Sequence, residues 1–170
     1  FEVAVSIDGV GRLADEIRGV DDAFEKSMST FLDLRDLFRG HKSSNARINY
    51  LISPHNIGRL AGFLDEIEGR GVKAREVSVD VARNSVFFRN THTPIQLNPT
   101  DVSQEIGDYL DRLPKGFDSV FDRNIFFGRV YLRLLEEYLA SGEGIPCSCL
   151  EGFLFMDPYG LVYPCSGVEE

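Results

Sequence analysis

The stretch FEVAVSIDGVGRLADEIRG, residues 1–19, opens the chain and sets its expected fold. Residues 1–7 are β-prone and nearly all apolar, which predicts a strand of a parallel sheet covered on both faces. Asp8 and Gly9 then break the strand. Because ligands of parallel α/β proteins bind beyond the carboxyl ends of the strands, the residues just after this strand are candidates for a site.

The residues that follow alternate between helix and strand patterns. We expect a helix over residues 21–40, a strand over 46–53, a helix over 57–67 and a strand over 74–81. Short connections between such units predict a parallel sheet with right-handed crossovers. The expected fold class is therefore α/β, and half of a doubly wound sheet or half of a (β/α) barrel would both satisfy the pattern.

The second half of the chain has a different organisation. Residues 82–100 form an irregular connection, and two helices are expected at 101–113 and 118–140. The stretch GFLFMDPYGLVYPC, residues 152–165, predicts a β-hairpin whose turn places Asp157 opposite Gly160. We therefore expect helices and then a C-terminal hairpin after the α/β units.

Composition limits the class of protein. The 170 residues carry a formal net charge of -9, which argues against nucleic-acid binding because phosphate contacts need a cationic face. No apolar run is long enough to cross a membrane. Three cysteines do not make a disulfide framework, so a reducing cytoplasm is the expected location.

Two groups of residues could carry chemistry. Ser6 and Asp8 fall on the same face at the end of the first strand, and Arg18 can return over it, which suits a ligand with a ribose and a carboxylate. A plain turn and a surface charge explain the same residues. At the hairpin, Cys149 and Cys165 meet at the open end and could bind a metal, although small buried hydrophobes are the alternative.

Both groups together resemble radical S-adenosylmethionine (SAM) enzymes of the SPASM group. After the fourth barrel strand that family usually reads Ser-x-Asp-Gly and then Asp-x-x-Arg-Gly, which is matched here by Ser6, Asp8, Gly9, Asp15, Arg18 and Gly19. A histidine that often precedes the arginine motif is replaced by Ala14. The hairpin is similar to the opening of the SPASM motif, Cys-x(9–15)-Gly-x4-Cys, through Cys149, Gly160 and Cys165.

The resemblance implies a domain organisation. Residues 1–100 would form a partial TIM-like barrel, with strands four to six in about three βα units. Residues 101–146 would be a helical connection, and residues 147–170 would begin the auxiliary-cluster domain.

The resemblance also implies cofactors and their ligands. Ser6 and Arg18 would contact the ribose and carboxylate of SAM, with Asp8 beside them and Val79 near the adenine or sulfonium. Cys149 and Cys165 would be ligands of an auxiliary [4Fe-4S] cluster, with Cys147 as an extra ligand. The parent enzyme would cleave SAM to a 5′-deoxyadenosyl radical and abstract hydrogen from a substrate such as a peptide or protein.

The motif for the catalytic cluster and the later cysteines of the SPASM motif are missing from these 170 residues. The Cys-x3-Cys-x2-Cys motif that holds the catalytic cluster does not occur, so the chain alone is expected to be inactive. Two other hypotheses remain open. The chain could be a non-catalytic α/β module whose thiols bind zinc or nothing, or a module that self-associates through the edges of its sheet.

Overall fold

A three-stranded parallel sheet forms the centre of the protein. The computed structural model describes residues 2–41, 44–84, 92, 95–115, 123–141, 155–156 and 159–163. Strands β1 (Glu2–Ser6), β2 (Asn45–Ile52) and β3 (Val77–Val81) make an open sheet in the order β1-β2-β3. The α/β class expected from the sequence is confirmed, and each strand pairs with the next strand along the chain.

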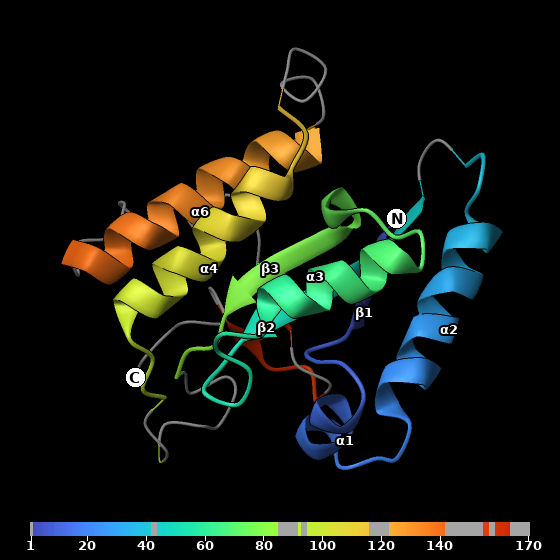
Figure 1. Cartoon of the computed structure of the whole chain (residues 1–170), viewed down its shortest axis with the longest axis horizontal. Coiled ribbons are helices and arrows are strands. Elements are labelled where there is room, and N and C mark those ends of the chain that lie inside the picture. Colours follow the sequence, from blue (N-terminus) through green and yellow to red (C-terminus); the bar gives the residue numbers. More distant parts are fainter. Residues whose placement is uncertain are drawn as a thin grey trace.

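Five α-helices accompany this sheet in the described part of the chain: α1 (Arg12–Arg18), α2 (Ala23–Leu37), α3 (Leu60–Gly69), α4 (Pro99–Arg112) and α6 (Arg123–Ser141). Figure 1 shows α3 running along the sheet, with α4 and α6 packed side by side next to β3. None of these helices combines the length and the apolar character that crossing a bilayer requires.

The two faces of the sheet differ in burial. Alternate residues of β2 and β3 are buried, namely Ile48, Tyr50, Ile52, Val77, Val79 and Val81. The ring of Tyr50 lies 4.7 Å from the ring of Phe63 in α3, so this buried face is the one that α3 covers. The residues between them, such as Asn49 and Asp80, are only half-buried. The helices therefore leave the opposite face more open.

The expectation that the first strand is covered on both faces was wrong. Glu2, Ala4 and Ser6 of β1 are exposed, while the residues between them are half-buried. The exposed residues lie on the face away from the helices, and β1 stands at an edge of the described sheet, with β2 as its single described neighbour.

The third strand starts later than expected. Residues Ala74–Glu76 form a short 3-10 helix, and β3 begins only at Val77. The carboxylate of Glu76 accepts a hydrogen bond of 2.8 Å from the backbone N–H of Lys73, which closes this turn. This local side-chain contact stabilises a turn where the sequence was expected to begin a strand.

A buried acid links α4 to the start of α3. Glu105 is 8% exposed, and its Oε1 accepts a hydrogen bond of 3.3 Å from the backbone N–H of Leu60. Its Oε2 is buried without a described partner, as is the hydroxyl of Tyr50. Burial raises the pKa of Glu105 above its ordinary value, against the opposing effect of backbone N–H groups at the start of α3.

We expect Glu105→Gln to change how stability depends on pH. As pH rises from 4.5 toward the raised pKa of the folded state, the unfolded chain releases the Glu105 proton while the folded chain keeps it, so stability falls. Glutamine cannot ionise and keeps an acceptor for Leu60. Urea denaturation at several pH values should therefore show the variant gaining on the wild type as pH rises. Glu137→Gln, at an exposed position of α6, is the control. A difference between Glu105→Gln and wild type that does not grow with pH would contradict this account.

Candidate functional site

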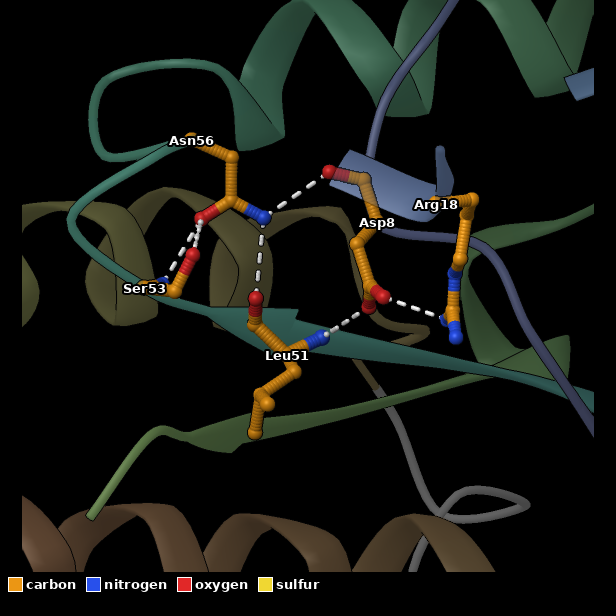
Figure 2. A network of polar contacts seen from close by, with 5 residues as sticks. All are labelled: Asp8, Arg18, Leu51, Ser53 and Asn56. Atoms are coloured by element: carbon orange, nitrogen blue, oxygen red, sulfur yellow. Dashed lines mark hydrogen bonds and ion pairs between the residues drawn. The ribbon is translucent and has the colours of Figure 1, made fainter. Parts of the chain in front are cut away.

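The candidate site is built around Asp8, which follows β1 at the carboxyl end of the sheet. Asp8 is 9% exposed, and its carboxylate has two partners. Oδ1 accepts a hydrogen bond of 2.9 Å from the backbone N–H of Leu51, and Oδ2 accepts one of 2.5 Å from Arg18 (Figure 2). The carboxylate therefore joins the ends of β1 and β2 to the last residue of α1.

A second side chain, Asn56, completes this polar network. It is fully buried, and its Nδ2 donates hydrogen bonds of 2.8 Å to the backbone oxygens of Asp8 and Leu51. Its Oδ1 accepts hydrogen bonds from Ser53, at 2.7 Å from the backbone N–H and 3.1 Å from the hydroxyl. Figure 2 shows Asn56 between the two strand ends, where it fixes the loops that follow β1 and β2.

Helix α1 holds Arg18 in place through the residues around it. Asp15, one turn earlier, accepts a hydrogen bond of 2.8 Å from the backbone N–H of Ala23, the first residue of α2. Gly19 ends α1 in the left-handed conformation with φ 66°, which glycine adopts without steric cost. Asp15, Arg18 and Gly19, which carry the family resemblance, thus each have a structural task.

Loss of the Asp15 contact should weaken the junction between α1 and α2. The side chain of Asp22, at the N-cap of α2, makes no capping hydrogen bond, so Asp15 performs that task from another helix. We expect Asp15→Ala to lower the free energy of unfolding by about 1 kcal/mol, as other lost helix caps do. Asp33→Ala, at an exposed position within α2, is the control. Equal unfolding midpoints for the two variants in urea would contradict the capping role.

Ser6 lies at the last position of β1 and is exposed. It pairs with Asn49 of β2, and both belong to the more open face of the sheet. Asp80 of β3 lies on the same face, where it accepts a hydrogen bond of 2.6 Å from the hydroxyl of Tyr131 in α6. The open face is therefore polar near its carboxyl end.

The structure brings Asp8 and Arg18 together and separates Val79 from them. The strand ends at Ser6, so the alternation expected to align Ser6 with Asp8 stops, and the Asp8 carboxylate turns toward Leu51. Val79 is 4% exposed and lies on the face that α3 covers, opposite to the face of Ser6. Its side chain is therefore directed away from the open face.

The cysteines predicted as metal ligands, Cys147, Cys149 and Cys165, lie outside the described residues. Among those that are described, no three His, Cys, Asp or Glu side chains form a group able to hold a metal ion. The iron–sulfur prediction therefore stays a prediction.

Part of the hairpin region is described. Strands β4 (Phe155–Met156) and β5 (Val162–Tyr163) pair antiparallel, with Phe155 opposite Tyr163. The expected register, with Asp157 opposite Gly160, would place Phe155 opposite Val162, so the observed pairing is displaced by one residue. Gly160 has φ 86°, a conformation typical of an added bulge residue, which accounts for the displacement.

A hollow of about 520 Å³ adjoins the polar network on the side of α1 and α3. Gly9 and His55, each next in sequence to a network residue, line it together with Arg59. We assign it no role, since the polar groups of Asp8 and Asn56 are directed to other partners.

Asn56 was not predicted as part of the site, because it falls between the strand expected over 46–53 and the helix expected over 57–67. A signal was present, because an asparagine three residues after a serine at a strand end is typical of side-chain-to-backbone turns. Its contact with Asp8, 48 positions away, had no local signal.

Comparison of the chain with protein-family models, with curated proteins and with solved structures found no match in any of the three.

Proposed function

We propose that the chain is part of a radical SAM enzyme of the SPASM group, and that β1, β2 and β3 are strands four to six of a partial (β/α) barrel. The sequential strand order supports this, because barrels are built from neighbouring βα units. The unequal burial of the two sheet faces also supports the proposal. In a barrel the helices cover the outside, and the face carrying Ser6 and Asp80 would line the interior.

The observation that carries the proposal is the Asp8–Arg18 pair at the carboxyl end of β1. The Arg18 side chain is 40% exposed although Asp8 holds its Nη2. A guanidinium has five N–H donors, so Arg18 retains donors for the carboxylate of SAM while Asp8 fixes its orientation. Ser6 presents a hydroxyl for the ribose at the same end of the strand. Any contact from Val79 to the adenine would use its main chain.

The auxiliary-cluster ligands of this proposal are Cys149 and Cys165, with Cys147 as an extra one. When bound, a catalytic [4Fe-4S] cluster supplies the electron that cleaves SAM to a 5′-deoxyadenosyl radical. The motif for that cluster does not occur in the 170 residues, so catalysis needs ligands from elsewhere. The radical would abstract hydrogen from a substrate, which we propose to be a cytoplasmic peptide or protein.

Anaerobic reconstitution of the full-length protein with iron and sulfide tests the proposal. We expect a brown protein with broad absorbance at about 400 nm, typical of iron–sulfur clusters, and release of deoxyadenosine when SAM and a reductant are added. Bound zinc without deoxyadenosine release would contradict the proposal.

A module for self-association is the second candidate. The strand order leaves β1 at an edge of the sheet, where its outer backbone groups have no partner strand among the described residues. Two results together would favour this candidate: the protein does not cleave SAM, and the Cys149→Ser, Cys165→Ser double variant still forms a dimer. Analytical ultracentrifugation measures the dimer.

A further inference from the structure

A hollow at the amino end of the sheet gathers three arginines. It measures about 220 Å³ and lies between α2, the start of β2 and the short helix before β3. Arg35, Arg47 and Arg75 line it, and Glu76 is its one acidic lining residue in the described part of the chain. This hollow lies at the opposite end of the strands from Asp8 and Arg18.

The first arginine is held by contacts on several sides. Nη1 of Arg35 donates a hydrogen bond of 3.1 Å to the backbone oxygen of Gly71 and lies 3.7 Å from the Glu76 carboxylate. Its guanidinium carbon is 5.7 Å from the centre of the Phe31 ring. The group is therefore oriented before any ligand arrives, which lowers the entropy cost of binding.

The other two arginines have unused donors. Nε of Arg47 is buried and makes no hydrogen bond to a described residue, although it lies 3.3 Å from the Glu2 carboxylate. Arg75 is exposed, and its side chain has no described hydrogen bond or ion pair. The contact of Arg47 Nε with Glu2 lacks hydrogen-bond geometry, so an acceptor that is better placed for the Arg47 guanidinium would be favourable.

We propose that this hollow binds a phosphate group, either as inorganic phosphate or as the terminal phosphate of a small phosphomonoester. Three arginines stand against two carboxylates here, those of Glu76 and Glu2, in a protein whose net charge is -9, so the cations are concentrated against the overall charge. Guanidinium N–H groups match the oxygens of phosphate in pairs, and a doubly charged anion gains more from three cations than a single carboxylate does. The proposal is independent of the SAM site.

Arginine side-chain NMR tests this proposal directly. Inorganic phosphate is titrated into ¹⁵N-labelled protein at constant ionic strength, and the Nε–Hε signals of every arginine are followed. We expect the signals of Arg35, Arg47 and Arg75 to shift together and to saturate with a single dissociation constant. Glycerol phosphate in place of phosphate shows whether a phosphomonoester is accepted. Shifts that do not saturate, or that are equal at the exposed Arg39, would mean an adventitious ion only and would overturn the proposal.

A pair of variants separates binding from folding. Arg75→Gln removes an exposed side chain without described partners, so the fold should be retained, and the affinity for phosphate should fall about tenfold, as expected for one lost charged hydrogen bond. Arg39→Gln is the matched control, because Arg39 pairs with Asp36 outside the hollow. Equal phosphate affinity in the two variants would also overturn the proposal.

Discussion

Replacing Asn56 by alanine is expected to lower the free energy of unfolding by about 3–4 kcal/mol. The amide makes four hydrogen bonds and is fully buried. Without it, the backbone oxygens of Asp8 and Leu51 lose the donor that the fully buried amide supplies. Chemical denaturation of the purified variant measures the effect.

Two further variants test whether the effect comes from the buried amide of Asn56. Asn98→Ala removes the same side chain at an exposed helix cap, where it accepts one hydrogen bond from the backbone N–H of Thr100, and should cost only about 1 kcal/mol. Asn56→Asp keeps the acceptor for Ser53 but sets an oxygen against the carbonyls of Asp8 and Leu51, so it should be nearly as harmful as alanine. If Asn56→Ala costs no more than Asn98→Ala, the loops do not depend on this amide.

On the proposed function, replacing Arg18 by glutamine is expected to weaken SAM binding by about 10–100-fold in the reconstituted full-length protein, as the loss of a charge-assisted hydrogen bond predicts. Glutamine keeps an N–H donor on the same side of α1, although its side chain is shorter than that of arginine, so the network should be perturbed less than with alanine. The charge that would face the carboxylate of SAM is lost. Equilibrium dialysis with labelled SAM measures binding, and urea denaturation shows whether the fold is retained.

Arg12→Gln is the matched control, since Arg12 lies on the same helix, is 91% exposed in its side chain and pairs with Glu16. It should leave SAM binding unchanged. Unaltered binding by Arg18→Gln would contradict the role of Arg18, whereas a similar loss in both variants would indicate a general effect of charge on α1.

The sequence predicted the strands better than the surroundings of the strands. The apolar runs at residues 1–7 and 46–53 match β1 and β2 closely, because strand formation there agrees with local propensity. Which face a helix covers is a tertiary property, so the exposure of Ala4 in β1 could not be read from its neighbours.

Helix α1 was not expected at all. Its seven residues carry a short apolar pattern between glycines, and isolated helices of that length are unstable in water. It is held instead by contacts with residues outside the helix, as in the ion pair of Arg18 with Asp8. The site could be predicted only in part. The residue types near a strand end indicated Asp8 and Arg18, but the groups that orient Asp8 come from β2 and the loop after it, which the local sequence does not reveal.

The order in which the strands lie has a consequence for how the protein forms. Every strand pairs with its neighbour along the chain, so the sheet can grow by one unit at a time as the polypeptide leaves the ribosome, with little loop-closure entropy at each step. The first pair becomes locked only when Asn56 has emerged and reaches back to Asp8. We therefore expect a nascent chain ending before residue 56 to be protease-sensitive, and one that includes α3 to be protected.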